Sequence, residues 1–327
     1  NLHSVKSLLT LIEDYTYTKT SLKHTNRGTL LTMKIVGLLL VFLCTFGGLL
    51  IAMGFKVDQF MNLMMMILKA VPGEFVIIFG CAVAAFLVAN DGPTIKGTIK
   101  YLGALTKPHA YNKEDYIELL SMLFTVFKLA RTKGWLALEQ HIENSHDSEL
   151  FGRFPKFQHN HHAIVFFCDY LRIISLGNEN PFELEALMDM EIETLSEHEG
   201  HPGHAVQTMA DGIPALGIVA AVLGVIKTMA SISEPPEVLG KMIGGALVGT
   251  FLGVWLSYGM VAPIAGAMTV KANTEVMYYK CMKVAIIAFL NGAAPQVAVE
   301  FARKFLPHDV QPTFMELEEV LNELPPP

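Results

Sequence analysis

Long uncharged stretches recur along the chain, and they predict helices that cross a membrane. Residues 35–55 and 242–270 contain no charged residue, and each stretch exceeds the roughly 20 residues that a helix needs to span the hydrocarbon core of a bilayer. Residues 75–90 and 212–226 form shorter stretches that are equally uncharged. The second of these reaches spanning length when Lys227 is included, because a lysine side chain can extend to the lipid headgroups. The pattern predicts four transmembrane helices.

Elsewhere the apolar positions follow the helical period and predict helices with one polar face. Residues 116–133 show this period. Another helix is predicted to begin at Asn180, because Asn is a good cap and Pro181 fits the first turn. The chain after Lys271 is again helical in pattern. We predict an all-α membrane protein with a large helical insertion between spans two and three and a helical C-terminal tail.

The four spans divide the chain into five regions. Residues 1–32 form an N-terminal extension, which we expect to be dispensable and not native, because the chain begins with Asn and Met33 is a candidate initiator. The other regions are a transmembrane hairpin (33–90), the insertion (91–210), a second transmembrane hairpin (211–270) and the C-terminal tail (271–327).

Composition and charge favour a membrane protein with both termini in the cytoplasm. Hydrophobic residues make up 52% of the chain and charged residues 17%, which is typical of a protein that hides much of its surface from water. Lysine and arginine are concentrated before the first span and after the second and fourth. Such residues mark the cytoplasmic side, so the insertion and the tail are expected to be cytoplasmic. The net charge of −7 gives no footprint for binding nucleic acid.

Two histidine clusters invite a metal-site interpretation, but their spacing disfavours it. In HEGHPGH (198–204), His198 and His201 are three positions apart, whereas a helical zinc site needs histidines at positions i and i+4. We also expect Pro202 and its flanking glycines to break the helix. The HNHH cluster (159–162) fits a metal no better. We therefore expect no metal site, and a membrane metalloprotein built on these clusters stays as an alternative.

No catalytic motif stands out, which argues against an enzyme. The acidic residues after Asn180 lie along one predicted helix, where like charges favour a solvated face. GxSxG, P-loop and strand-linked GxGxxG motifs do not occur in the sequence. The four cysteines fall in spans or in predicted cytoplasmic segments, so none is expected to form a structural disulfide. We expect no bound cofactor.

Small residues recur at every fourth position of the fourth span, at Gly245, Gly249 and Gly253, followed by Ser257. Such a stripe lets another helix approach the backbone closely. The pattern suits packing within the chain and packing in an oligomer equally well, and both interpretations stay open.

The predicted spans lack an ionisable group at depth. Their deep parts contain only Thr250, Ser257, Tyr258 and cysteines as polar side chains. A path for protons or sodium needs an ionisable group near the middle of the membrane. If ions move through this protein, we therefore expect another chain to bring the carboxylate.

Several long motifs resemble those of one known family. The spans contribute ADGIPALGIVAAVLGVIKTM (210–229) and GGALVGTFLGVWLSYGMVAPIAGAM (244–268), and the polar segments contribute KLARTKGWLALEQHIEN, LRIISLGNENPFELEALMDMEIET, AVEFARK and PTFMELEEVL. Together these motifs resemble the MotA subunits of the bacterial flagellar stator, within the MotA/TolQ/ExbB proton-channel superfamily. The resemblance covers nearly all of residues 33–324.

The resemblance implies a multi-pass protein of the bacterial inner membrane that converts ion flow into torque. Five copies of such a chain are expected to surround two copies of a single-span MotB-type subunit, which supplies the ion-carrying aspartate. The insertion (91–210) is expected to meet the rotor switch protein FliG, and the second hairpin (211–270) is expected to line the channel. Protons rather than sodium are the expected ion, and membrane lipids are the expected surroundings.

Five residues of the second hairpin carry the expected channel and coupling roles. By the resemblance, Pro214 and Pro263 match two family prolines, which kink their helices. Thr250 matches a channel-facing threonine, and Tyr258 is assigned to the same set. Ala221 lies where sodium-driven relatives have a hydroxyl group. Losing an oxygen ligand disfavours a hard cation, so this position favours protons.

Three charged residues of the insertion carry the expected rotor contact. Arg131 and Glu139 match the charged pair that meets FliG in the family, and Lys133 lies between them. On a continuous helix the pair would lie within about 80° of each other, although Gly134 interrupts the pattern. Charged pairs steer encounters more than they add affinity, which suits a contact that is repeatedly made and broken.

Two other interpretations are kept. An energising subunit of the ExbB/TolQ type has three spans and lacks the ELEE-containing tail, so the number of spans discriminates it from the MotA type. The metalloprotein would bind zinc through the histidine clusters. The resemblance gives no role to Lys227, at the end of the third span.

Overall fold

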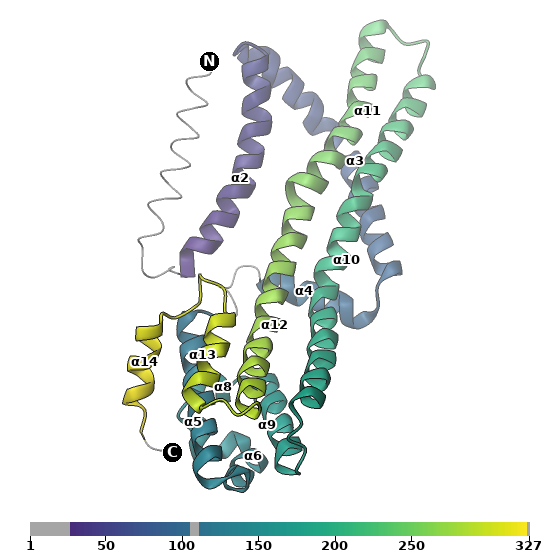
Figure 1. Cartoon of the computed structure of the whole chain (residues 1–327). Helices are drawn as coiled ribbons and strands as arrows, with labels where there is room; N and C mark the ends of the chain where they lie inside the picture. Colours follow the sequence, from purple (N-terminus) through teal and green to yellow (C-terminus); the bar gives the residue numbers. More distant parts are fainter. Residues whose placement is uncertain (1–26, 105–110, 326–327) are drawn as a thin grey trace. The chain divides into compact units, whose positions relative to one another are not determined.

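The computed structural model describes residues 27–104 and 111–325, with side chains described from residue 32 onward (Figure 1). Most of the predicted extension, residues 1–32, lies outside the described residues, and the first described helix, α2 (Arg27–Ala52), begins near its end. All regular secondary structure in the described part of the chain is helical, as predicted.

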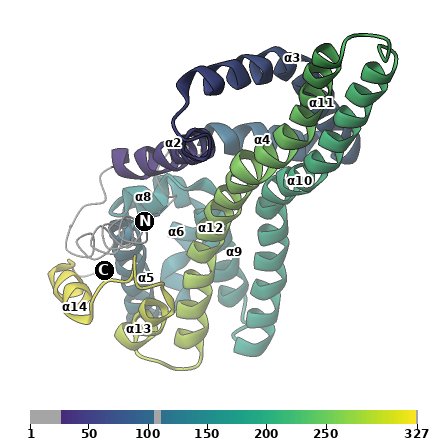
Figure 2. The ribbon, with the colours of Figure 1, turned by 90° about the horizontal axis from the view of Figure 1, so that it is seen from above.

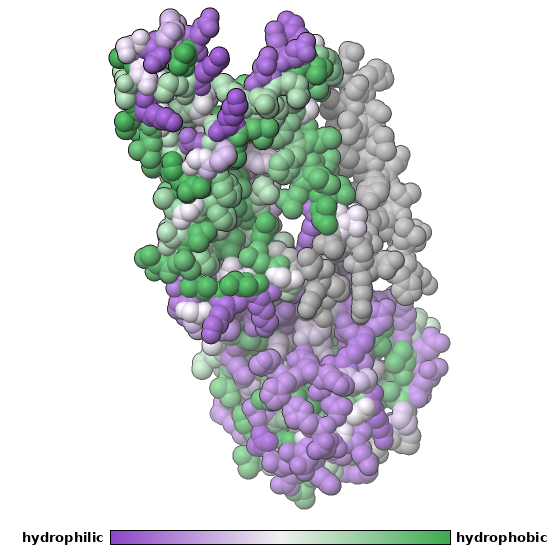
Figure 3. All heavy atoms as spheres, turned by 180° about the vertical axis from the view of Figure 1, so that it is seen from behind, coloured by the Kyte–Doolittle hydropathy of each residue, from purple (hydrophilic) through white to green (hydrophobic). Residues whose placement is uncertain are grey.

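The chain forms two compact units. The membrane unit comprises the described part of residues 1–108 together with residues 208–264, and the polar unit comprises the described part of residues 109–207 together with residues 265–327. Figure 3 shows apolar side chains gathered over the membrane unit and polar side chains gathered over the polar unit.

Four helices in the described residues are long and apolar enough to cross a membrane, which confirms the predicted number of spans. They are α2, α3 (Val57–Ala89), α10 (Pro181–Met229) and a continuous run of α11 (Pro236–Leu256), the π-helical segment η4 (Ser257–Val261) and α12 (Ala262–Leu290). A further helix, α4 (Gly92–Ala104), follows α3. Many large apolar side chains on these helices face outward, for example Leu43 and Val76, as expected for surface that contacts lipid.

A short turn joins α2 to α3, and α2 packs against α11. The turn places Gly54 at φ 64° and Phe55 at φ 58°, and the glycine adopts this left-handed conformation without steric cost. The indole N–H of Trp255 on α11 donates a 3.0 Å hydrogen bond to Oγ1 of Thr45 on α2. The Phe42 ring meets the same indole edge-on at 4.5 Å, so one tryptophan anchors α2 in the membrane unit.

The second span is longer than the sequence pattern predicts. We expect residues 57–71 to form a separate short helix that ends before Pro72, but α3 runs without interruption from Val57 to Ala89 with Pro72 inside it. A proline removes one backbone hydrogen bond, and neighbouring helices in a membrane can compensate for that loss. The correction matters because it places Glu74 inside a spanning helix.

The third span is also part of a longer helix. The HEGHPGH motif predicts that the helix ends at Pro202, but α10 continues through this residue. A Cβ atom at Gly203 would lie 2.8 Å from Oγ1 of Thr269 on α12, so the glycine permits close packing of the two helices. This packing, between residues far apart in sequence, offsets the low helix propensity of proline and glycine.

The polar unit is built from short helices around α5 (Lys113–Lys133). The helix begins three residues before the predicted start at Tyr116 and is capped by Asn112, whose side chain accepts from the N–H of Asp115, while the Asp115 carboxylate accepts from the N–H of Asn112. The remaining elements are η2 (Trp135–Leu138), α6 (Glu139–Glu143), η3 (Ser145–Asp147), α7 (Glu149–Gly152), α8 (Pro155–Gln158), α9 (His161–Ser175), α13 (Pro295–Phe305) and α14 (Phe314–Glu323).

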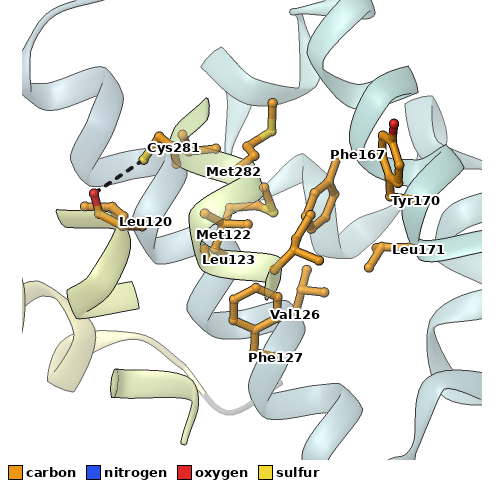
Figure 4. Packing of buried hydrophobic residues seen from close by; sticks show 14 of the residues in the cluster. Leu120, Met122, Leu123, Val126, Phe127, Phe167, Tyr170, Leu171, Cys281 and Met282 are labelled. Atoms are coloured by element: carbon orange, nitrogen blue, oxygen red, sulfur yellow. Dashed lines mark hydrogen bonds between the residues drawn. The ribbon is translucent and has the colours of Figure 1, made fainter. Parts of the chain in front are cut away.

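Large apolar side chains fill the interior of the polar unit. Figure 4 shows Met122 and Val126 of α5 gathered in one cluster with Phe167 of α9 and Met282 of α12. The Phe127 ring also stacks on Phe289 at a centroid distance of 4.5 Å. This cluster gives the polar unit the packed core of a water-soluble domain.

The AVEFARK and ELEE motifs fix the C-terminal tail. Arg303 is buried, pairs with Glu300, and donates from Nη1 to the carbonyl of Pro312 at 3.0 Å. Glu316 accepts from Lys113 Nζ at 2.6 Å and closes a capping box with Thr313 at the start of α14. The two motifs therefore dock the tail on the polar unit.

The acidic face of α10 is only partly solvated. Lys283 of α12 pairs with Asp189 at 2.8 Å and with Glu185 at 3.5 Å. The hydroxyl of Tyr170 donates to Glu191 at 2.6 Å. Some of the predicted solvent-facing charges thus pair with neighbouring elements of the polar unit.

Candidate functional site

α10 and α11 lie side by side in both views (Figures 1 and 2) and meet at glycines. A Cβ atom at Gly253 would lie 2.8 Å from Cα of Gly217, and a Cβ atom at Gly217 would lie 2.8 Å from the carbonyl oxygen of Gly249. Only glycine permits this approach, because any Cβ would overlap backbone atoms. A Cβ at Gly245 would meet nothing within 4 Å. Of the predicted packing glycines, Gly249 and Gly253 therefore pack within the chain, while Gly245 is open.

The same contact includes two residues of the predicted channel set. The main-chain nitrogen of Ala221 would lie 3.0 Å from a Cβ atom at Gly249. Ala221 is buried, and the half-buried Thr250 directly follows Gly249. The structure therefore places Ala221 against the turn of α11 that carries Thr250.

A carboxylate that the sequence analysis did not place in the membrane also lies here. Oε2 of Glu74, on α3, would lie 2.7 Å from a Cβ atom at Gly249, and Oε1 would lie 3.8 Å from a Cβ atom at Gly224. Oε2 is buried and has no hydrogen-bond partner among the described residues. Glu74 therefore adds an ionisable group to the packing of α3 against α10 and α11. A buried carboxylate oxygen of this kind calls for a functional explanation.

One charged residue faces Glu74 from the neighbouring helices. Lys227 lies one turn after Gly224 on α10 and interacts electrostatically with the Glu74 carboxylate. The apolar stretches of α11 and α2, residues 242–270 and 35–55, carry no charge. Lys227, which the resemblance leaves without a role, is thus the neighbouring charge of a carboxylate inside the membrane unit.

The two predicted prolines lie at breaks in helical hydrogen bonding. Pro214 is half-buried inside α10. Pro263 is the second residue of α12. It lies two residues after the end of the π-helical segment η4, and the N–H of Ala262 donates to the carbonyl of Ser257, five residues earlier. Tyr258, also in η4, is 63% exposed, so within the chain its side chain is free to meet another molecule.

The predicted rotor-contact residues surround the end of α5. Arg131 and Lys133 are exposed in its last turn, and Glu139 is exposed at the start of α6. Gly134 ends α5 at φ 79°, a conformation that favours glycine, and η2 follows. The three charges therefore do not share one continuous helix, but they lie on a short stretch of surface.

The histidine clusters do not form a metal site in the described part of the chain, where no group of three or more candidate ligands comes together. His198, His201 and His204 lie exposed along α10. His146 and His161 stack at 5.2 Å, and their ring nitrogens are 3.2 Å apart. This histidine pair lies in the polar unit.

No activated thiol is found in the polar unit among the described residues. Burial raises the pKa of the Cys168 thiol to about 12, so this thiol stays protonated at neutral pH and is a poor nucleophile. Cys281 is also buried, and its thiol donates weakly to the carbonyl of Ala302. These cysteines contribute to packing rather than to chemistry.

Comparison with known proteins identifies similar sequences over most of the chain. Residues 35–134 match the motility protein A N-terminal family, and residues 159–280 match the MotA/TolQ/ExbB proton channel family. The chain is 42% identical over 248 residues to motility protein A of Salmonella typhimurium (strain LT2), covering 76% of this chain and 84% of the relative. The values are the same for motility protein A of Escherichia coli (strain K12). It is 31% identical over 290 residues to chemotaxis protein LafT of Vibrio parahaemolyticus, covering 89% of this chain and 98% of the relative.

Solved structures share the fold. The flagellar MotAB stator complex from Bacillus subtilis contains a chain that aligns with a TM-score of 0.60 at 24% identity, covering 84% of this chain and 95% of that chain. The C. jejuni MotAB structure aligns with a TM-score of 0.58 at 22% identity, covering 72% of this chain and 84% of that chain. At these identities the similarity establishes the helical architecture.

Proposed function

The chain belongs to the motility protein A family, within the MotA/TolQ/ExbB proton channel family, and from this premise we propose how its parts work. It is a stator subunit of the bacterial flagellar motor that forms an ion channel with a MotB-type partner. It is a channel and motor subunit, not an enzyme. As a multi-pass membrane protein, it works in an oligomeric assembly with that partner.

The observation that carries this assignment is the pair α10 and α11 inside the matched region 159–280. The pair combines backbone contact at Gly217 and Gly253 with helix breaks at Pro214 and η4. Helices that meet without bulky side chains can shift by small steps, and proline supplies the local bend. This combination suits a part that moves when an ion binds.

The translocated ion is the proton, and sodium is the less favoured alternative. Ala221 brings no oxygen ligand to the contact with α11, and sodium, like other hard cations, needs several oxygen ligands. Glu74 offers one carboxylate whose Oε2 is covered by glycine backbone. A proton needs only this oxygen, so the geometry favours protonation over a coordinated metal cation.

Glu74 is the ionisable group that this chain itself brings to the ion path. An ionisable side chain is costly inside a membrane and marks relays and ion paths. The MotB-type partner brings the ion-carrying aspartate that the resemblance implies. Two carboxylates from two chains then share the path, with Lys227 as the charge that faces Glu74.

The spans lie in the inner membrane of the bacterial cell. The polar unit and both chain termini lie on its cytoplasmic side. Lysine and arginine flank the spans on this side, in accordance with the positive-inside rule. Arg131, Lys133 and Glu139 project from the surface around the end of α5 and contact the rotor switch protein FliG. Exposed charges of both signs suit a contact that is made and broken quickly.

Five copies of the chain form the ring around two copies of the partner. Gly245 is open within the chain and lies one helical turn before Gly249. Tyr258 is exposed two residues after Leu256, at the end of α11. The outward apolar side chains of α2 and α3 contact lipid.

Complementation tests the function. The chain and the MotB-type subunit encoded with it are expressed, together or singly, in a flagellated bacterium that lacks its own stator genes. We expect rotation of single motors with both chains, and none with either alone. Failure of both chains to restore rotation, although immunodetection finds them in the membrane in normal amounts, contradicts the assignment.

Charge reversal tests the rotor contact. Arg131→Glu and Glu139→Lys are expected to reduce motility, while membrane insertion and partner binding stay intact, because exposed charges contribute little to folding. Glu193→Lys, an exposed change on α10, is the matched control and should swim normally. Full swimming of both reversal variants contradicts the rotor contact.

Removal of sodium tests the ion. Motor speed is measured as sodium is replaced by potassium at a fixed proton-motive force. A constant speed is the expected result for protons, and a collapse of speed identifies sodium as the ion.

The other two interpretations lose support. An ExbB/TolQ-type subunit has three spans, whereas this chain has four candidate spans and the docked ELEE helix α14. The metalloprotein is built on the histidine clusters, whereas the match of residues 159–280 to the MotA/TolQ/ExbB proton channel family favours the stator subunit.

A further inference from the structure

Pro214 leaves a backbone carbonyl of α10 without its helical donor. In an α-helix the N–H of each residue bonds to the carbonyl four residues earlier, and proline has no N–H. The carbonyl affected by Pro214 is that of Ala210, which is fully buried. A buried carbonyl needs another partner or costs stability.

Ser257 supplies that partner. Its Oγ donates to the carbonyl oxygen of Ala210 at 2.6 Å, and Ser257 is itself 0% exposed. The bond joins α10 to η4, 47 positions apart in the sequence, and both residues belong to the membrane unit. In surroundings of low polarity such a bond is strong and its loss is costly.

Three threonine hydroxyls of the membrane unit behave differently. The side chains of Thr45, Thr98 and Thr228 donate to the carbonyl four residues earlier on their own helix, the usual choice for a hydroxyl within a helix. Ser257 instead donates to the neighbouring helix, at the carbonyl that Pro214 leaves without a donor. The bond is thus specific to the proline in α10.

Ser257 also begins the second helix break. Its carbonyl accepts from the N–H of Ala262, five residues later, and the next residue, Pro263, has no N–H. The π-helical segment η4 therefore starts at Ser257 and ends at Val261, two residues before Pro263. Ser257 therefore contacts both proline sites. Its side chain bonds to α10 near Pro214, and its backbone carbonyl bonds to the start of α12 near Pro263.

We propose that Ser257 is a positioning residue that couples the bend at Pro214 to the bend at Pro263. This inference rests on the proposed stator function and adds to it a connection between the two prolines. When α10 moves at Pro214, the hydrogen bond from Ser257 carries the movement to η4 and α12. π-Helical segments often occur at functional sites, and this one holds the donor.

Removing the hydroxyl tests the coupling in the motor. Ser257→Ala leaves the Ala210 carbonyl unpaired, and we expect the torque of each stator unit to fall by about tenfold, while the number of fluorescently counted units per motor stays normal. Ser257→Thr keeps a hydroxyl and is expected to retain most of the torque. Thr228→Val removes a hydroxyl that is hydrogen-bonded within α10, and motors that carry this variant should produce normal torque.

A double-mutant cycle on the purified complex tests the hydrogen bond itself. Pro214→Ala restores an N–H for the Ala210 carbonyl, so Ser257→Ala should lower the melting temperature of the wild-type complex and leave that of the Pro214→Ala complex nearly unchanged. Equal losses in both backgrounds, or normal torque for Ser257→Ala, overturn the inference. Lack of torque from the wild-type pair overturns the proposed function instead, because the melting cycle does not depend on rotation.

Discussion

The polar unit and the membrane unit hold their helices together in different ways. In the polar unit, large side chains such as Phe127 and Phe289 fill the interior. In the membrane unit, α10 and α11 meet backbone to backbone at Gly217 and Gly253, and large side chains face outward. Burial of apolar surface stabilises helix packing in water but gives little gain between helices in lipid. Removing a large side chain should therefore destabilise the polar unit, whereas adding a methyl group between α10 and α11 should destabilise the membrane unit.

The largest effect is expected from the core of the polar unit. Phe127→Ala removes a fully buried ring that stacks on Phe289, and such a cavity costs about 3–5 kcal/mol in the free energy of unfolding. Thermal unfolding of the purified complex measures it. Phe182→Ala, at a ring that is 80% exposed, is the control. Equal melting temperatures for the two variants would mean that the core does not stabilise this unit.

A smaller loss is expected when a methyl group is added between α10 and α11. In Gly253→Ala the new Cβ would lie 2.8 Å from Cα of Gly217, so the helices must separate at a cost of about 1–3 kcal/mol. Gly245→Ala places a methyl group in open space and gains slightly in helix propensity. The Gly253→Ala complex should therefore melt at a lower temperature than the Gly245→Ala complex. An equal fall in melting temperature for both variants would mean that the two glycines do not differ in packing.

Glu74→Gln is expected to leave stability within about 0.5 kcal/mol of the wild type. Oε2 accepts no hydrogen bond from the described residues, and the lost attraction to Lys227 is offset because a partly buried charge is removed. Torque should fall several-fold, and its dependence on pH should flatten, because the amide cannot bind and release a proton. Glu74→Asp keeps the acid and should retain a pH response. Wild-type torque and an unchanged pH profile for the glutamine variant would exclude Glu74 from the ion path.

The smallest effect is expected at the surface pair of the polar unit. Lys113 and the N–H of Thr313 hold the pKa of Glu316 at about 2, below its ordinary value of 4.5. The pair therefore contributes fully above pH 4.5, and its contribution is lost as the pH falls toward 2. Because both side chains are partly exposed, the contribution is about 1 kcal/mol or less. In Glu316→Gln this part of the pH dependence of unfolding should be missing.

Features written in the local sequence were predictable. The four candidate spans follow from long uncharged stretches, and the end of α5 at Lys133 follows from the apolar periodicity of residues 116–133. Gly134 was correctly suspected as an interruption, because its φ of 79° suits glycine and few other residues. These signals depend on neighbouring residues along the chain, so an isolated sequence contains them.

Features that depend on distant contacts were missed. Pro202 signals a helix end locally, but the packing of Gly203 on Thr269 keeps α10 continuous. The uncharged stretch predicts a span that begins after Glu74, yet α3 continues through Pro72 and Glu74. The bond from Ser257 to Ala210 links positions that no sequence period connects. In each case a helix far along the chain decides the local structure.

The central claim is that the backbone contact of α10 with α11 forms the moving wall of the ion path. The most direct test is the torque per stator unit in single motors that carry the wild-type, Gly253→Ala or Gly245→Ala chain with its partner. The account predicts wild-type torque for Gly245→Ala and a severe loss for Gly253→Ala at equal numbers of bound units. Full torque from Gly253→Ala would contradict it.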